Sequence, residues 1–353
     1  LRDAGSGVFE LAPAGADGQD LVNAPKEMEW MKRLSATIQR PVTFALLQNE
    51  TEPSLWKQLL EESIEATEQG SQCFPQVAGR PFGLLIGLQT HHAFAKRPTF
   101  INLAHLPHNE LVKQLKQSSI RNAILNEADT DPNPEILFDG MSRMIQSMLH
   151  RLYPMGEIPD YEPDPTKSFV SIAETKNTTP EAVLYDYMLE NDGFAMGMMP
   201  IFNYVDGNHD VIREMLLHPQ AVSGLSDGGA HCGMICDASI PTFMLSHWTR
   251  DRTRGKKLPL EWIIKKQTND TASLYGLNDR GTLQAGKRAD INVIDYNALT
   301  LHGPKMAHDL PAGGRRLLQE ATGYDYTVVA GIITRQFGQD TGQRPGRLIR
   351  GAR

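Results

Sequence analysis

The chain has 353 residues, more than a typical single domain needs, and carries a formal net charge of −7. Hydrophobic residues make up 40% and charged residues 22%, which is typical of a folded α/β protein and excludes a disordered or fibrous one. The negative charge and the lack of a clustered basic stripe argue against nucleic acid or an anionic membrane as the partner. We therefore expect a small-molecule substrate.

Cysteine usage and the first residues give two further expectations. Cys73, Cys232 and Cys236 are too few for a disulfide framework in a chain of this length, so we expect a cytoplasmic protein. No apolar run approaches the roughly 20 residues of a membrane helix. The chain opens LRDAG without an initiator Met, which is typical of a helix end that leads into a strand. We expect further sequence upstream, with a signal peptide left open, and we expect this stretch alone to be inactive.

The first third of the chain alternates short apolar runs with helical periodicity. Strands are predicted over residues 7–12, 41–48 and 72–78, and helices over 26–39 and 53–69. The inner face of the second helix is predicted to consist of Trp56, Leu59, Leu60, Ile64 and Ala66. This β, α, β, α, β order requires a parallel sheet, and both a barrel and a doubly wound sheet fit it.

Residues 89–192 break this rhythm and are predicted to form an insertion over the strand ends, which could serve as a lid. Helical segments are expected near 109–127 and 134–152. Thr179 followed by Pro180 predicts a capped helix that runs to about Asn191. Regular order is then expected to resume, with strands at 198–204 and 221–227 and helices at 210–217 and 259–275.

From Arg280 the sequence consists of short strands and turns, with strands predicted at 281–283, 289–295 and 326–334. We place the domain boundary near residues 277–279. The predicted organisation is therefore a parallel α/β domain over residues 1–278 and a small β domain over residues 279–353.

The strongest local feature is the segment 226–233, SDGGAHCG, at the end of a predicted strand. Strand ends point at the active site of a (β/α) barrel, so Asp227 could ligate a metal or take a proton from water. The alternative is an Asp that caps the next turn. His231 could orient substrate or share in proton transfer, or be structural. Cys232 and Cys236 are better explained as small buried residues than as metal ligands, because no second pair lies nearby.

Polar residues also follow the other predicted strands. Gln48, Gln76, Arg80 and Asn203 lie at or just past strand ends, where a pocket would need them, and Arg80 could anchor a carboxylate through a bidentate pair. Each could equally be a hydrogen-bonding loop residue. His91 and its neighbour His92 open the insertion, where we expect solvated surface. The sequence contains no dinucleotide or phosphate-binding loop, no Gly-x-Ser-x-Gly elbow and no His-Glu-x-x-His motif.

Four segments carry a resemblance to a known family: 226–233, 258–277 with LPLE and TASLYGL, 279–291 (DRGTLQAGKRADI) and 341–347 (TGQRPGR). They resemble the amidohydrolase superfamily, in particular amidohydrolase family 3 and its D-aminoacylase-like N-acyl-D-amino-acid deacylases. The resemblance implies a partial TIM-like (β/α) barrel of the metal-dependent hydrolase type, with its N-terminal strands upstream, and a small C-terminal β-sandwich portion.

The resemblance also implies an activity, which is hydrolysis of a non-peptide C–N bond in an N-acyl amino acid. Asp227 matches the last-strand Asp that binds metal or activates water, and Arg80 lies near where deacylases hold the substrate carboxylate. Gln48 and Gln76 stand where metal-dependent relatives place His, so one zinc ion is expected rather than two. A cyclic amidase of the hydantoinase or imidase type and a metal-free barrel that binds without hydrolysis are the alternatives, and a homo-oligomer is possible.

Overall fold

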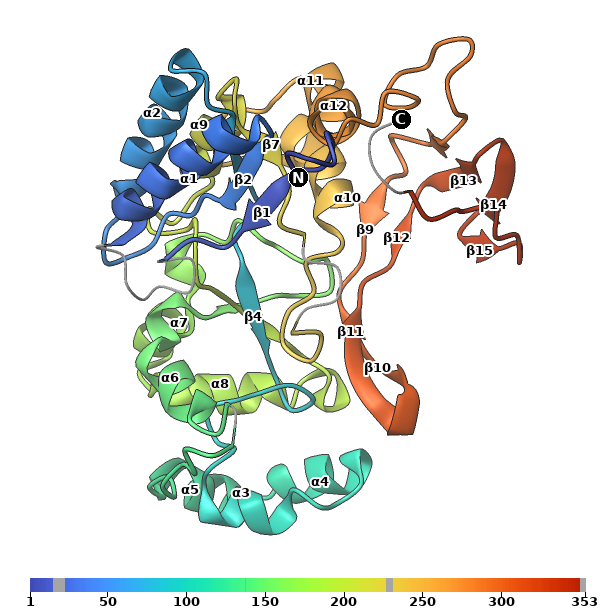
Figure 1. Cartoon of the computed structure of the whole chain (residues 1–353). Coiled ribbons are helices and arrows are strands. Elements are labelled where there is room, and N and C mark those ends of the chain that lie inside the picture. Colours follow the sequence, from blue (N-terminus) through green and yellow to red (C-terminus); the bar gives the residue numbers. More distant parts are fainter. Residues whose placement is uncertain (15–22, 137, 227–230, 350–353) are drawn as a thin grey trace.

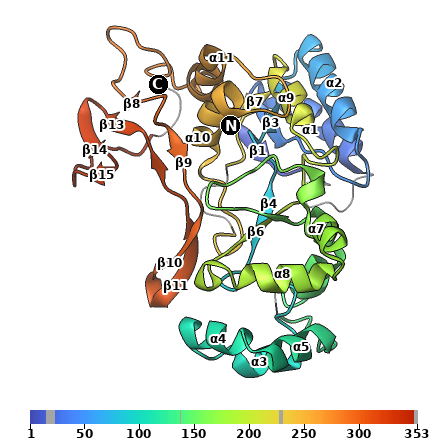
Figure 2. The same ribbon diagram turned by 180° about the vertical axis from the view of Figure 1, so that it is seen from behind.

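The structure is a computed structural model that describes residues 1–14, 23–136, 138–226 and 231–349. Its elements form three regions, which are a parallel sheet with its helices, a helical insertion and a C-terminal β region (Figure 1). The same arrangement is seen from behind in Figure 2, where the insertion again lies at the opposite end from α2 and α11. Asp227 lies outside the described residues.

A parallel sheet forms the part of the barrel that this chain contains. Its strands are β1 (Phe9–Leu11), β2 (Val42–Ala45), β3 (Cys73–Val77) and β7 (Val222–Ser223), which pair in the order β1-β2-β3-β7. Each pair is parallel, for example Val42 with Cys73 and Gln76 with Val222. The crossover helices are α1 (Ala24–Ile38), α2 (Leu55–Glu68) and α9 (Asp210–Leu217). The predicted partial barrel is therefore confirmed in its described strands.

The inner face of α2 differs from the prediction at one position. Trp56, Leu59, Leu60 and Ala66 are buried as expected, whereas Ile64 is exposed. Ser63 takes the inner position, because it lies four residues after Leu59, on the same face, and its hydroxyl donates to the Leu59 carbonyl.

A second sheet frames the insertion. It consists of β4 (Gly83–Ile86), β6 (Gly197–Pro200) and β5 (Tyr153–Pro154) in the order β4-β6-β5, and both pairings are antiparallel. The strand predicted at 198–204 therefore ends at Pro200 and belongs to this sheet rather than to the barrel. The prediction was wrong because an apolar run shows that a strand is buried but not which strand it pairs with.

The insertion has a hydrophobic core of its own, with Phe94, Phe169, Leu184 and Met188 fully buried. Its helices are α3 (Pro98–Leu103), α4 (His108–Leu115), α5 (Ser118–Asn126), α6 (Met141–Ser147), α7 (Phe169–Lys176) and α8 (Pro180–Met188). The helical segment expected near 109–127 thus contains two helices, α4 and α5. The cap of α8 is as predicted, because the Thr179 hydroxyl accepts from the backbone N–H of Ala182 at 3.2 Å.

The chain returns from β7 through α10 (Ile240–Ser246), α11 (Leu260–Lys265) and α12 (Thr271–Leu274). Helix α10 was not predicted. The C-terminal sheet contains β8 (Ile291–Ile294), β13 (Tyr324–Val329), β14 (Ile332–Gln336) and β15 (Gln339–Asp340), all antiparallel. The strand predicted at 326–334 is a hairpin, because Ala330 and Gly331 adopt the left-handed conformation that a tight hairpin turn requires. Residues 281–283 form no strand.

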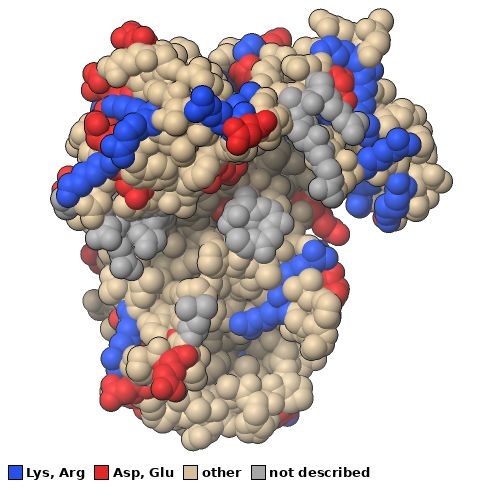
Figure 3. Space-filling model, viewed as in Figure 1, with Lys and Arg blue, Asp and Glu red and all other residues tan. Residues whose placement is uncertain are grey.

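The rest of the C-terminal region is a long antiparallel arm. Strands β10 (Lys305–Leu310) and β11 (Gly314–Leu318) form it, and β9 (Thr300–Leu301) pairs with β12 (Ala321–Thr322) at its base. On the face drawn in Figure 3, basic and acidic side chains are interspersed. Within the described part of the chain, no helix combines the length and apolar character needed to cross a bilayer.

Candidate functional site at the strand ends

The carboxyl ends of β3 and β7 lie side by side, because Gln76 pairs with Val222 and Val77 with Ser223 in parallel register. Arg80 follows β3 by three residues, and the chain that leaves β7 leads toward Asp227, which lies outside the described residues. Gly224 packs so closely against Gln76 that a Cβ there would collide with the Gln76 side-chain oxygen. The residues that follow these two strands therefore emerge at one edge of the sheet.

The structure brings Gln48 and Asn203 together. The Asn203 side-chain oxygen accepts from the Gln48 backbone N–H at 2.7 Å, and the Asn203 N–H donates to the Gln48 carbonyl at 2.9 Å. Asn203 is fully buried, adopts φ of 62° and lies three residues beyond the end of β6. The Gln48 amide also donates to Asp206 at 3.2 Å. This pair joins the end of the barrel strand to the loop behind the insertion sheet.

Gln48 and Gln76 do not fit a zinc site. Zinc in proteins is held by Cys, His, Asp and Glu side chains, and these two positions offer amides. The Gln76 amide is moreover committed to the Thr43 hydroxyl, to which it donates at 2.6 Å. The described ends of β2 and β3 therefore supply no zinc ligand.

Arg80 is fully buried beside β3. Its Nη2 donates to the Cys236 carbonyl at 2.6 Å and to Asp237 Oδ1 at 3.1 Å, and its guanidinium carbon lies 3.7 Å from the centre of the Tyr161 ring. Trp248 fixes the preceding residue by donating from Nε1 to the Gly79 carbonyl at 2.7 Å. Cations over an aromatic face are attracted by its negative charge distribution, so Tyr161 and Asp237 both stabilise the charge of Arg80.

Two donors of Arg80, Nε and Nη1, are buried and have no hydrogen-bond partner among the described residues. They adjoin a cavity of about 10 Å³ whose lining includes Pro81, Met198 and Tyr161. That volume suffices for about one water molecule. Burial raises the pKa of Tyr161 to about 12, so the phenol is neutral near pH 7 and remains a good partner for the cation.

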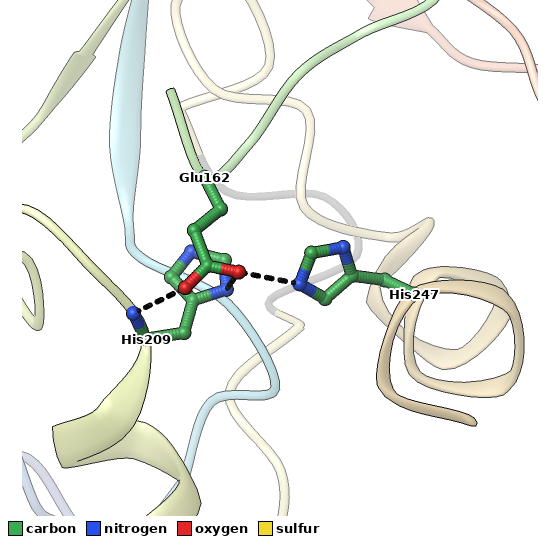
Figure 4. A group of neighbouring side chains, drawn as sticks. All are labelled: Glu162, His209 and His247. Atoms are coloured by element: carbon green, nitrogen blue, oxygen red, sulfur yellow. Dashed lines mark hydrogen bonds and ion pairs between the residues drawn. The ribbon is translucent and has the colours of Figure 1, made fainter. Parts of the chain in front are cut away.

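A second cluster adjoins the first through Tyr161. Glu162 accepts from His247 Nε2 at 3.0 Å and lies 3.6 Å from His209 Nδ1 (Figure 4). Arg252 donates to both carboxylate oxygens of Glu162, at 3.1 and 2.9 Å. His209 Nε2 contacts the Tyr161 carbonyl at 2.8 Å. The three side chains come from the loop before α7, the residue before α9 and the end of α10.

Burial and hydrogen bonding together set the charge states of Glu162 and His209. Burial raises the pKa of Glu162, but the hydrogen bonds from His247 and Arg252 outweigh it and hold that pKa well below its usual range. Burial lowers the pKa of His209 to about 3, against the attraction of Glu162. At neutral pH the cluster therefore contains an ionised carboxylate and a neutral His209 ring.

Sequence reasoning did not select Glu162, His209 or His247. His209 and His247 lie 47 and 85 residues after Glu162 along the chain, so no local spacing connects the three residues. The other predicted residues do not lie together. His231 is exposed near Phe138, with 6.2 Å between the ring centres. Cys232 is partly exposed, and Cys236 is buried. His92 was expected on the surface, yet it is buried against Phe100.

Comparison with known proteins gives a family match over part of the chain and a similar fold over the whole of it. Residues 189–335 match the amidohydrolase family. A D-aminoacylase structure, described for the functional role of its binuclear metal centre, aligns over 100% of this chain with 18% identity and a TM-score of 0.53. A second, described as a D-aminoacylase that defines a novel subset of amidohydrolases, aligns over 98% with 17% identity and a TM-score of 0.51. A search of curated proteins found no match.

The chain spans 57% and 56% of the lengths of these two D-aminoacylases. At this level of identity the likeness concerns the fold, and the family match covers the segment that contains α9, β7 and α10 to α12. Residues 189–335 thus match the amidohydrolase family, and the chain as a whole has a fold similar to that of the D-aminoacylases.

Proposed function

We propose that the protein hydrolyses a non-peptide C–N bond, most specifically the amide of an N-acyl-D-amino acid. The observation that carries this proposal is the family match over residues 189–335, which contains the segment that follows β7 and leads to Asp227. In barrels of this type the residues beyond the strand ends do the chemistry. The D configuration rests on the D-aminoacylase-like fold.

Asp227 has the central role in the proposed reaction. Water attacks the amide carbonyl carbon while Asp227 accepts a proton from it, and the same carboxyl group then gives that proton to the nitrogen as the C–N bond breaks. The products are a carboxylic acid and a free amino acid. A backbone or side-chain donor near Asp227 would stabilise the negative charge on the carbonyl oxygen.

Zinc is proposed from the family resemblance alone. A bound zinc ion polarises a carbonyl and lowers the pKa of its water to about 7. Because Gln48 and Gln76 offer no zinc ligand, a zinc ion at the strand ends would depend on Asp227 and on ligands other than these two positions. We therefore assign no step of the reaction to a metal.

Arg80 is proposed to select substrates that carry a carboxylate. Its two unpartnered donors, Nε and Nη1, lie on different edges of the guanidinium, so each would donate a single charged hydrogen bond to a substrate carboxylate. The adjoining cavity is too small for a substrate, so binding requires that the lining around Pro81 and Met198 open. Asp237 would keep its contact with Nη2.

The test is a comparison of substrates and variants. We expect hydrolysis of N-acyl-D-amino acids and little hydrolysis of the L enantiomers. Replacing the substrate carboxylate by a neutral amide should lower kcat/KM by about 100-fold, since charged hydrogen bonds contribute about 1.5–3 kcal/mol each. Arg80→Lys should remove most of that preference by raising KM. Equal rates for charged and neutral substrates would contradict the role of Arg80.

A barrel that binds a small molecule without hydrolysing it is the second candidate. The observation that favours it is the commitment of the Gln48 and Gln76 amides to hydrogen bonds within the protein. Binding of an N-acyl amino acid without turnover, over a panel that includes cyclic amides, would decide for this candidate. Turnover of cyclic amides alone would indicate the hydantoinase or imidase type.

A further inference from the structure

We propose that Glu162, His209 and His247 form a binding site for a divalent transition-metal ion, with zinc as the preferred ion. This site is separate from the strand-end residues of the proposed reaction. One atom of each side chain can face the ion, and the three atoms lie within 4.8 Å of one another. Two imidazoles and a carboxylate are a ligand set that zinc accepts. The proposal is independent of the proposed function.

The spacing of the three atoms fits a tetrahedral ion. Glu162 Oε2 lies 3.0 Å from His247 Nε2 and 3.6 Å from His209 Nδ1. Ligands that each lie about 2.0–2.2 Å from zinc at the corners of a tetrahedron are about 3.4 Å apart. Two of the three separations are thus within about 0.4 Å of that spacing. The two imidazole nitrogens lie within 4.8 Å of each other, so a turn of the His247 ring would bring all three atoms to bonding distance, with the fourth position left for water.

His209 supplies the observation that points to a cation. Its Nε2 faces the Tyr161 carbonyl, which can only accept, so the proton of the neutral ring is on Nε2. Nδ1 then carries a lone pair, is fully buried and has no hydrogen-bond partner in the part of the chain that the structure describes. This lone pair faces a carboxylate oxygen of Glu162, which is also an acceptor. Two acceptors that face each other in a buried site repel unless a cation lies between them.

The local charge leaves room for a dication despite the buried Arg252. The carboxylates of Glu162, Asp164 and Asp210 face the guanidiniums of Arg252 and Arg254, so one negative charge is in excess among these five. Arg252 uses one lone pair on each Glu162 oxygen. A carboxylate oxygen has two lone pairs, and the second on Oε2 is the one that now accepts from His247.

The surroundings already hold the ligands in place. Metal-bound imidazoles usually donate their other N–H to a carbonyl or carboxylate, as His209 does to Tyr161. Phe243 stacks on the His247 ring, with centres 4.4 Å apart and planes at 16°. The side chain of His247 is 17% exposed, whereas Glu162 and His209 are buried, so the ion would enter from the His247 side.

Such an ion would clamp together three segments that are distant in sequence. Glu162 follows the Tyr153–Pro154 strand of the insertion, His209 precedes α9, and His247 ends α10. The ion would thus tie the insertion to two helices of the barrel. Metal bound to the folded state alone raises its stability by mass action.

The test uses zinc and cobalt ions on the whole protein after treatment with a chelator. We expect zinc to raise Tm, and cobalt to give the visible absorption of a four- or five-coordinate ion. His209→Leu and His247→Phe, which preserve bulk and stacking, should each weaken zinc binding by more than about 100-fold, since even changes next to ligands cost about 10–100-fold. The losses in the two histidine variants should be the same in an Asp227→Asn background, because Asp227 takes no part in this site. The exposed His105→Leu is the matched control.

Zinc binding and Tm shifts that are the same in both histidine variants as in the His105→Leu control would overturn the proposal. Were both variants unable to fold, anomalous scattering at the zinc edge from crystals of the unaltered protein would decide. A peak between the three side chains supports the site, and a zinc-soaked crystal with no peak there refutes it. None of these measurements depends on enzymatic activity, so failure here leaves the proposed hydrolysis untouched.

Discussion

Arg252 and Arg121 each bind a carboxylate through two hydrogen bonds, but they do so at different depths. The Arg252 side chain is 0% exposed and its partner Glu162 is 3% exposed, whereas Arg121 and Asp186 are 32% and 58% exposed. A charge in a buried pair loses its hydration on folding and is stabilised only by its partner. The charges of an exposed pair stay hydrated whether or not they are paired.

We expect Arg252→Met to lower the free energy of unfolding by about 3–5 kcal/mol, because it leaves the Glu162 carboxylate buried without its main partner. Arg121→Met is the matched control and should cost less than about 1 kcal/mol. Urea unfolding followed by circular dichroism measures both. Equal losses in the two variants would contradict the account of burial.

His92 predicts a dependence of stability on pH. It is 3% exposed, its Nδ1 accepts from the Phe94 N–H, and burial followed by repulsion from His91 lowers its pKa to about 3. The unfolded chain has the ordinary pKa near 6.5, so between the two values it binds a proton that the folded state does not. Its stability contribution is therefore complete above pH 6.5 and is lost as the pH falls toward 3.

Between pH 8 and pH 5 this group alone should remove about 2 kcal/mol of stability. His92→Asn keeps an acceptor for the Phe94 N–H but cannot be protonated, so its unfolding free energy should fall by about 2 kcal/mol less over the same range. Urea titrations at both pH values provide the comparison. An unchanged difference between pH 8 and pH 5 would show that His92 is not the group responsible.

At the level of single elements, α8 depends on its first residue. Thr179 accepts from the Ala182 N–H, and Pro180 occupies the first helical position, where no N–H is needed. Thr179→Ala should therefore lower stability by about 1 kcal/mol, and Thr179→Ser should restore most of it. Thermal unfolding of the three proteins tests this, and a Ser variant no better than Ala would show that the hydroxyl is not the cause.

Elements that depend on local signals could be predicted from sequence, and elements that depend on distant contacts could not. Helices α1, α2, α8 and α9 were predicted within a few residues because helical periodicity, and in α8 the Thr179 cap, are local signals. The pairing of β6 with β4 and β5 was not, since it joins segments more than 40 residues apart. Helix α10 was missed because all seven of its residues are apolar or buried, so the helix has no polar face.

At the scale of the whole molecule, sequence reasoning placed Gln48 and Gln76 at strand ends because parallel strands share one edge. It identified Arg80 but not its burial, which depends on Tyr161 and Asp237 from distant segments. The Glu162 cluster could not be foreseen at all, because only folding brings its residues together. Asp227 remains a prediction.

The family match and the D-aminoacylase-like fold bear on different parts of the molecule. The fold accounts for the adjacent ends of β3 and β7, and the family match over residues 189–335 includes the segment that leads to Asp227. Function depends on the site rather than on the fold, so the chemistry at Asp227 is the part of the proposal that most needs a measurement.

The most direct test of the proposed hydrolysis is the rate at which free amino acid is released from an N-acyl-D-amino acid by the protein and by its Asp227→Asn variant, which differ by one proton-accepting group. Removing such a group typically costs about 100- to 10,000-fold. We expect turnover by the unaltered protein and a fall in kcat of at least about 100-fold in the variant, with Tm preserved. Equal rates in the two proteins would contradict the central role of Asp227, and no turnover in either would contradict the proposed hydrolysis itself.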